Sequence, residues 1–364
     1  MKIIHCADLH LDSSLSSYPK DIAAKRREEL LLGFGRMVEY ARSNDIENIL
    51  IAGDLFDKKR PSASAVKFVT DVMTSHPGIN FYYLKGNHDC DELYEDKQMM
   101  PANLKMFDKD WMTYTIADLH DGQGCSVTVS AVENSDSSCA TTIPALDMNA
   151  FNIVMMHGDV GEGTGINLRN LRGCGIDYLA LGHIHSYRYE SLDKNGYYCY
   201  PGCLSSRGYD ECGEHGFVVL DIDRENKSQK VTLKSIETRD ILKIDVDISE
   251  CMNSVDVLEK VKSVVEANIH SSDAIFLIEL TGATDISCDK NVHMLEQYFN
   301  SNYMHVRVHD NSEYRVDFKD YALDESLKGE FVRTVFADQT LSDDDKAAII
   351  RLGIRALKGE EIDL

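Results

Sequence analysis

The chain has 364 residues, a net charge of −23 and a hydrophobic fraction of 43%, a composition typical of a globular protein with two domains. Its apolar stretches are all shorter than the ~20 residues of a membrane-spanning helix, and none near the N-terminus resembles a signal peptide. We therefore expect a cytoplasmic protein, with no membrane contact and with its ten cysteines as reduced thiols. The acidic balance disfavours a nucleic-acid surface built from Lys and Arg alone.

The first quarter of the chain alternates between short apolar strands and amphipathic helices. Strands are expected at residues 3–7, 48–52 and 81–84, with a helix after each of the first two. This alternation predicts an α/β domain with parallel strands. Ligands of such sheets bind beyond the carboxyl ends of the strands, so the residues that follow each strand are the first place to look for a site.

The pattern continues to the C-terminus with one interruption near residue 240. Further strands are expected at residues 152–156, 178–181, 216–222 and 230–236. After the interruption the expected elements are strands at 241–248, 274–280 and 303–308, and helices at 255–267, 292–299, 327–336 and 346–357. The sequence therefore predicts a second, smaller α/β unit that is followed by two closing helices.

Five polar motifs follow the apolar runs of the first unit, and a Pro201-Gly202 turn comes after them. The motifs are Asp8-x-His10, Gly53-Asp54, Gly86-Asn87-His88-Asp89, His157-Gly158-Asp159 and Gly182-His183-Ile184-His185. Carboxylate oxygen, amide oxygen and imidazole nitrogen suit divalent metals such as Mn, Fe or Zn. One such motif would be weak evidence, but five in this order at predicted strand ends indicate a two-metal site.

The motif order resembles that of the calcineurin-like metallophosphoesterase superfamily. In its details the chain is similar to the SbcD branch of DNA double-strand-break repair nucleases, which includes YhaO-like relatives. The similarity is carried by residues 1–12, 53–57 and 200–204, and it extends from residue 1 to about residue 240.

This resemblance implies a fold and a division of the chain. The fold is a four-layer α/β/β/α metallophosphoesterase sandwich with a small α/β capping domain and C-terminal helices. The implied parts are the nuclease domain at residues 1–239, the capping domain at 240–320 and a C-terminal helical partner-binding segment at 321–364.

The resemblance also assigns roles to the motif residues. Seven of them are implied to be metal ligands: Asp8, His10 and His185 at the first ion, Asp54 between the two ions, and Asn87, His157 and His183 at the second. Two divalent ions are implied, with Mn²⁺ the best match and Fe, Zn or Mg compatible with the same ligands. His88 is then free to act as a general acid, with Asp89 orienting its ring.

The implied activity is that of a DNA nuclease, a double-strand exonuclease with hairpin or single-strand endonuclease activity. A water molecule activated by two metals would attack phosphorus. Some relatives carry a histidine where this chain has Asp57, which leaves the balance of the two activities open.

The candidate DNA contacts are Lys58, Lys59 and Arg60, which follow a metal motif directly, and Arg207. A solvated face is the ordinary alternative for each basic cluster. The resemblance further implies an SbcC-like SMC/ABC ATPase that binds the C-terminal helices, and a homodimer.

Two other interpretations compete with the nuclease. A small-molecule or cyclic-nucleotide phosphodiesterase of the same superfamily would share every metal ligand, although the predicted second unit and closing helices argue against it. A non-catalytic protein that only docks on an ATPase would be expected to lack ligands, whereas all seven are present here.

Overall fold

The computed structural model describes residues 1–57, 60–89, 100–118, 124–133, 143–161, 165–237, 239–285, 288–315, 321 and 323–357. The chain divides into two compact units, Met1–Thr238 and Arg239–Leu364, and a separate hydrophobic cluster forms the core of each. Over the described ranges, none of the helices combines the length and the apolar character that crossing a membrane requires.

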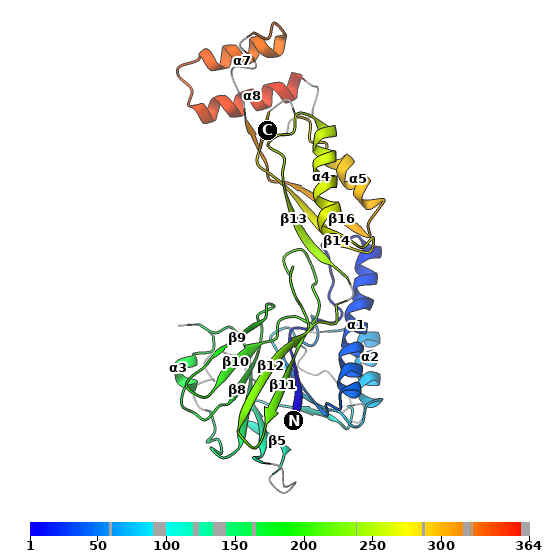
Figure 1. Cartoon of the computed structure of the whole chain (residues 1–364), viewed down its shortest axis with the longest axis vertical. Coiled ribbons are helices and arrows are strands. Elements are labelled where there is room, and N and C mark those ends of the chain that lie inside the picture. The colour runs from blue at the N-terminus through cyan, green and yellow to red at the C-terminus, as the bar shows by residue number, and fades with distance from the viewer. Residues whose placement is uncertain are drawn as a thin grey trace. The chain divides into compact units, whose positions relative to one another are not determined.

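The first unit contains two six-stranded sheets (Figure 1). The first sheet has the order β12-β11-β1-β2-β3-β4. Its strands are β1 (Lys2–Cys6), β2 (Asn48–Ala52), β3 (Asn80–Leu84), β4 (Leu104–Met106), β11 (Phe217–Asp223) and β12 (Ser228–Lys234). Strands β1 to β4 are parallel, and β11 and β12 extend the sheet on the other side of β1 with antiparallel pairing.

The second sheet has the order β5-β6-β7-β8-β10-β9. Its strands are β5 (Met112–Ala117), β6 (Val127–Ala131), β7 (Phe151–His157), β8 (Tyr178–Gly182), β9 (Arg188–Ser191) and β10 (Tyr197–Tyr200). The four central strands are parallel, and the two edge strands β5 and β9 are antiparallel to their neighbours. Each sheet therefore has one edge where the carboxyl ends of several parallel strands meet.

The side chains between the two sheets form the main core. Leu50 of β2 and Ile153 of β7 belong to this cluster and are fully buried, and each such side chain contributes about 1.5–3 kcal/mol to stability. Helices α1 (Lys20–Ser43) and α2 (Ala63–Thr74) lie side by side in Figure 1, and Phe34 of α1 contacts Phe81 of β3 with 6.4 Å between ring centroids.

The opposite face of the second sheet has its own apolar cluster. This cluster includes Leu171 of the short helix α3 (Leu168–Leu171) together with Val154 of β7 and Leu179 of β8. The order of layers is thus helices, sheet, sheet and a final layer in which α3 is the helix among the described residues. The predicted four-layer α/β/β/α sandwich is confirmed.

The second unit contains a small parallel sheet and four helices in the described ranges. The sheet has the order β13-β14-β16, and a two-stranded pair β15-β17 lies outside it. The strands are β13 (Ile241–Asp247), β14 (Ile275–Thr281), β15 (Ala283–Asp285), β16 (His305–Asp310) and β17 (Glu313–Arg315), and the helices are α4 (Ser254–Asn268), α5 (Val292–Asn300), α7 (Leu327–Ala337) and α8 (Asp343–Leu357). Val261 of α4 and Phe299 of α5 pack on the three-stranded sheet in one buried cluster.

Helices α7 and α8 form a hairpin with a core of its own. Val332 and Val335 of α7 pack against Ile350 and Ile354 of α8. The small α/β part and the closing helices are therefore as predicted. The predicted boundary between a capping domain at 240–320 and a partner-binding segment at 321–364 stays a prediction.

Candidate metal centre

The loops after β1 and β2 are held side by side by backbone hydrogen bonds. The amide of Asp8 donates to the carbonyl of Gly53 at 3.1 Å, and the amide of His10 donates to the carbonyl of Asp54 at 3.0 Å. Asp8, His10 and Asp54 all have positive φ angles, of 53°, 43° and 52°. Left-handed backbone at residues other than glycine costs about 1–3 kcal/mol and is concentrated at functional sites. The strain here falls on three predicted metal ligands.

Glycine is required on both sides of Asp54. Gly53 has a φ of +93°, and a Cβ atom on it would lie 2.1 Å from Nδ1 of His157. A Cβ atom on Gly86, in the loop after β3, would lie 2.2 Å from Oδ1 of Asp54. These two glycines allow the imidazole and the carboxylate to approach the neighbouring backbone.

The loop after β3 brings Asn87 and His88 to the same edge. The amide of His88 donates to Oδ1 of Asp54 at 2.9 Å. From the second sheet, β7 ends at His157 and β8 ends one residue before His183. The amide of His183 donates to both carboxylate oxygens of Asp8 at 2.9 Å, which ties the two sheets together at the site.

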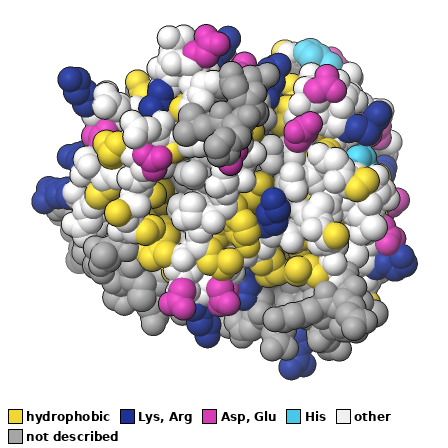
Figure 2. All heavy atoms as spheres, turned by 90° about the horizontal axis from the view of Figure 1, so that it is seen from below, with side chains coloured by type: hydrophobic (Ala, Val, Ile, Leu, Met, Phe, Trp, Pro, Cys, Tyr) yellow, Lys and Arg dark blue, Asp and Glu magenta, His cyan; other side chains and the backbone are white. Residues whose placement is uncertain are grey.

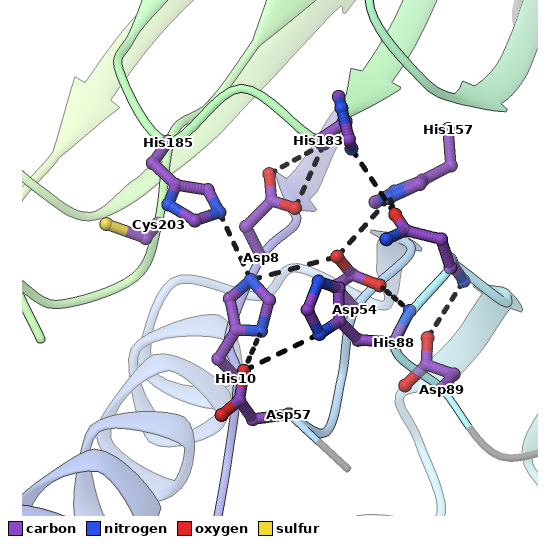
Figure 3. A network of polar contacts seen from close by, with 12 residues as sticks. Asp8, His10, Asp54, Asp57, His88, Asp89, His157, His183, His185 and Cys203 are labelled. Carbon is purple, nitrogen blue, oxygen red and sulfur yellow. Dashed lines mark hydrogen bonds and ion pairs between the residues drawn. The ribbon is translucent and has the colours of Figure 1, made fainter. Parts of the chain in front are cut away.

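Five of the other predicted ligands surround Asp54 in Figure 3, namely Asp8, His10, His157, His183 and His185. Oδ2 of Asp54 lies 3.4 Å from Nε2 of His157 and 3.7 Å from Nε2 of His10. Nε2 of His10 lies 3.2 Å from Nε2 of His185. On the other side, Oδ1 of Asn87 lies 2.9 Å from Nε2 of His157 and 3.3 Å from Nδ1 of His183.

The donor set fits divalent metal ions. Three groups among the described residues have ligand atoms within 4.8 Å of one another: Asp8/His10/His185, Asp8/Asp54/His157 and His10/Asp57/His88. Nδ1 of His10 faces Oδ1 of Asp57 at 2.9 Å, and Nδ1 of His185 faces Oε1 of Glu211 at 2.7 Å. Protons on these Nδ1 atoms leave two Nε2 lone pairs that face each other, which is favourable when a cation lies between them.

The electrostatics among the site's own side chains centre on one buried ion pair. Burial lowers the pKa of His157, but its hydrogen bond to Asp54 and the charges of Asp54 and Asp8 outweigh burial and raise that pKa to about 9. Burial alone would raise the pKa of Asp54, and the hydrogen bond and charge of His157 outweigh it, so the pKa of Asp54 is lowered. Asp8 is different: burial is the main cause that raises its pKa to about 6.

Glu211 is an ionised carboxylate beside the site. Burial raises its pKa, but hydrogen bonds from His185 and Arg207 outweigh burial, and the pKa is held far below its ordinary value. The pKa of His185 is raised by the hydrogen bond to Glu211, against the effect of burial. A charged carboxylate therefore stands behind this imidazole.

Asp89 makes contacts other than those expected from its place beside His88. Its buried carboxylate accepts hydrogen bonds from the amides of Gly86 and Phe56, both at 2.9 Å. The carboxylate that faces Nδ1 of His88, at 3.8 Å, belongs to Asp57. Asp89 is directed toward the backbone because consecutive residues in this loop point in different directions, and it joins the loops after β2 and β3.

The residues that were predicted to contact DNA differ in their structural surroundings. Lys58 and Lys59 lie outside the described residues, and Arg60 is exposed. Arg207 contacts Asp57 and Glu211, at 3.2 Å and 2.6 Å, so it belongs to the site instead of an open surface. Glu211 was not predicted. Its one sequence signal is its position in the loop after the Pro201-Gly202 turn.

The chain is similar in sequence to several known proteins, among them the following three. The uncharacterized metallophosphoesterase YhaO of Bacillus subtilis is 28% identical over 284 residues, which cover 72% of this chain and 67% of that protein. The SbcD component of the SbcCD nuclease of Staphylococcus saprophyticus is 25% identical, with 68% and 71% covered. The DNA double-strand break repair protein Mre11 of Aeropyrum pernix is 24% identical, with 74% and 69% covered.

A family model also matches the part of the chain that carries the site. The model describes calcineurin-like phosphoesterases, and it matches residues 1–187, more than half of the 364 residues. The matched part contains all seven predicted ligands and ends just after His185. The chain therefore belongs to the calcineurin-like phosphoesterase family.

Proposed function

We propose that this protein is a metal-dependent DNA nuclease of DNA repair, a double-strand exonuclease that also cleaves hairpins or single strands. The observation that carries the proposal is the position of Asp54, whose Oδ2 atom lies between His10 and His157. A carboxylate in that position suits a pair of divalent ions. The choice of DNA is supported by the names of two relatives, a nuclease component and a double-strand-break repair protein.

The ligands divide into two sets that share a carboxylate. Asp8, His10 and His185 would hold one ion, and Asn87, His157 and His183 the other, with Asp54 between them. When bound, such ions lower the pKa of water toward neutrality and offset the negative charge of a phosphodiester. Mn²⁺ is the metal we propose, because the mixture of oxygen and imidazole ligands suits a borderline ion.

His88 is placed to move a proton. Its backbone amide is held by Asp54, and 47% of its side chain is exposed to solvent. Nδ1 faces Asp57, which leaves Nε2 as the atom that can donate a proton to the departing sugar oxygen. His88 is therefore the proposed general acid.

The charge of the chain limits how DNA is held. The net charge is −23, and on the face drawn in Figure 2 Lys and Arg side chains are scattered among acidic ones. Phosphate contacts by surface cations would then be few, and the affinity of the chain alone for DNA would be low. Arg60, with Lys58 and Lys59 beside it in the sequence, stays the proposed cationic contact near the site.

A partner would supply the missing affinity. We propose that α7 and α8 bind an SbcC-like SMC/ABC ATPase and that the protein acts as a homodimer. Four apolar residues are buried in the hairpin core and three more pack against them, but Leu327, Ile349 and Leu357 are 71%, 37% and 46% exposed. These three side chains are the proposed contacts.

The alternative is a small-molecule or cyclic-nucleotide phosphodiesterase. The acidic net charge favours it, because a small ester needs no extended cationic surface. Its metal ligands would be identical, so the substrate alone separates the two functions.

The deciding experiment supplies the purified protein with Mn²⁺ and four substrates: linear duplex DNA, hairpin DNA, a cyclic nucleotide and bis-p-nitrophenyl phosphate. An Asp54→Ala variant prepared in parallel controls for a contaminating nuclease. Cleavage of either DNA by the parent alone supports the nuclease. Turnover restricted to the small esters would establish the alternative.

A further inference from the structure

We propose that Arg207 is a positioning residue that holds His10 and His185 as a matched pair of metal ligands, acting through Asp57 and Glu211. The inference rests on the proposed metal centre, but it does not depend on the identity of the substrate. It replaces the DNA contact that the sequence predicted for Arg207.

The five side chains form a closed ring. Arg207 donates from Nη1 to Oδ1 of Asp57 at 3.2 Å and from Nη2 to Oε1 of Glu211 at 2.6 Å. Asp57 faces Nδ1 of His10 at 2.9 Å, and Glu211 faces Nδ1 of His185 at 2.7 Å. The ring closes where the two Nε2 atoms face each other at 3.2 Å. One guanidinium thus links the carboxylates behind both imidazoles, and we call Arg207, Asp57 and Glu211 the clamp.

This linkage favours Nε2 of each ring as the nitrogen that binds a metal. Glu211 is hydrogen-bonded to Nδ1 of His185, which keeps the proton there and leaves the Nε2 lone pair for the ion. Asp57 meets Nδ1 of His10 as an ion-pair contact without hydrogen-bond geometry, so its negative charge favours a proton on that nitrogen. Nη2 of Arg207 lies 3.1 Å from Nδ1 of His185, so without Glu211 the guanidinium could donate to that nitrogen and move the ring proton to Nε2. Glu211 prevents this because it accepts from both groups.

Arginine is needed because one planar guanidinium group must donate to two carboxylates, from Nη1 to Asp57 and from Nε and Nη2 to Glu211. Nε of Arg207 also approaches Oε1 and Oε2 of Glu211, at 3.2 Å and 3.3 Å, while Nη1 serves Asp57. Lysine has one compact ammonium group and cannot reproduce this geometry. These contacts also occupy the guanidinium, and only 18% of the Arg207 side chain is exposed, which leaves little of it for a DNA phosphate.

The loop that carries Arg207 and Glu211 is itself anchored. The amide of Arg207 donates to Oε2 of Glu211 at 2.9 Å, and the buried Arg26 of α1 donates to the carbonyl of Ser206 at 2.7 Å. The ring nitrogen Nε2 of His215 contacts the carbonyl of Glu211. The clamp is therefore fixed to the helix layer of the first sheet by contacts among protein groups.

The clamp reaches only one of the two sets of ligands. Within the described part of the chain, the hydrogen bonds and ion pairs of Asn87, His157 and His183 do not include Arg207. Nδ1 of His157 is held instead by the carbonyl of Ala52 at 2.9 Å. Loss of Arg207 should therefore weaken the first ion's site and spare the second.

The test measures Mn²⁺ binding by equilibrium dialysis and the electron paramagnetic resonance spectrum of the bound ions. The variants are Arg207→Lys, Arg207→Ala and Glu211→Gln, with Arg42→Ala as the matched control, since Arg42 forms an exposed pair with Glu39 on α1. Thermal unfolding of each metal-free variant reports whether it is folded.

We expect two bound ions with a spin-coupled spectrum in the parent and in Arg42→Ala. In the other three variants the first ion should bind about 10–100-fold more weakly, and the remaining ion should give an uncoupled spectrum. Two coupled ions with parental affinity in Arg207→Lys or Arg207→Ala would overturn the clamp, as would equal weakening of both ions or loss of the fold in all three variants. A parent that binds no Mn²⁺ would instead contradict the metal centre itself.

Discussion

Oδ1 of Asp57 lies 3.8 Å from Nδ1 of His88, so the proposed general acid faces a carboxylate from the loop after β2. The same oxygen contacts His10 and Arg207. Asp57 thus connects the predicted metal ligand His10 to the proposed general acid. The proposed proton transfer and metal binding would share this residue, but they can be separated by substitution of His88, which is not itself a predicted ligand.

Substitution of His88 should reduce activity without removing metal. A His88→Asn variant lacks the donor and keeps the backbone amide that binds Asp54, so we expect a rate about 10²–10⁴-fold lower with parental Mn²⁺ content. Cleavage of linear duplex DNA and elemental analysis measure the two quantities. A variant that cleaves DNA as fast as its parent would refute the acid assignment.

Substitution of Asp54 should reduce both the activity and the metal content. An Asp54→Ala variant lacks the carboxylate between the two ligand sets, so we expect loss of at least one ion and a rate reduced by at least about 100-fold. Asp71→Ala is the matched control, because that carboxylate is 61% exposed and pairs with Lys67 on α2. Retention of two ions by Asp54→Ala would contradict its bridging position.

Metal binding should release protons at neutral pH. The pKa of His157 is about 9 in the metal-free protein, so its imidazole is protonated at pH 7 and must lose that proton to bind an ion. The apparent Mn²⁺ affinity should therefore rise between pH 6.5 and about 9. Calorimetric titrations in two buffers of different ionisation enthalpy measure the released protons, and identical heats in both buffers would contradict the prediction.

The raised pKa of His157 also makes the stability of the metal-free protein depend on pH, and stability falls with rising pH where Mn²⁺ affinity rises. In the metal-free protein the His157–Asp54 pair stabilises the fold fully below pH 6.5, and this contribution is lost as the pH rises through about 9. Addition of Mn²⁺ should remove this dependence, because the ion replaces the proton. Urea unfolding at several pH values, with and without Mn²⁺, measures both effects.

Asp89 should matter for stability more than for proton transfer. In Asp89→Ala the amides of Gly86 and Phe56 lose their partner, which costs about 1–3 kcal/mol for each amide that stays buried. Urea unfolding of the metal-free protein measures this loss against the Asp71→Ala control. A variant with parental stability and a low rate would restore the role in orienting His88.

The exposed apolar side chains of the α7–α8 hairpin should govern partner binding. Removal of residues 325–364 should abolish co-purification with the ATPase, and a Leu327→Glu, Leu357→Glu double variant should weaken it while the hairpin core stays intact. Met252→Glu changes an apolar residue that is 73% exposed outside the hairpin and serves as the control. Undiminished binding by the deletion variant would refute the assignment.

The sequence predicted the parts of the fold whose residues form clear apolar patterns. The strands that lead to Asp8, Asp54, Asn87, His157 and His183 are buried on both faces and read as apolar runs. Strand β9, at one edge of the second sheet, was not predicted for the converse reason. Strand β9 has three exposed residues out of four and no apolar alternation, so nothing in residues 188–191 distinguishes it from a loop.

The parts of the site that the sequence does not reveal depend on contacts between distant segments. Glu211 contacts His185 because the loop after the Pro201-Gly202 turn folds back toward the site. The four-residue separation of Arg207 and Glu211 in the sequence does not indicate that contact. Asp89 is adjacent to His88 in the motif, yet Asp57 is the carboxylate that faces the His88 ring. The motifs predicted which side chains meet at the site, and their role as metal ligands stays a prediction, whereas the groups that contact them became visible only with the fold.

The contact between His10 and His185 joins residues 175 positions apart, so half of the polypeptide must be in place before the first pair of ligands exists. A nascent chain whose β8 is still inside the ribosome would lack His183 and His185, one proposed ligand of each ion. Metal binding would then require that the chain has folded at least as far as His185. At a free ion concentration of 100 times the dissociation constant, a bound ion would add about 2.7 kcal/mol to the free energy of unfolding of the unit that holds it. Chelators should accordingly lower the melting temperature of the N-terminal unit and leave that of residues 239–364 unchanged.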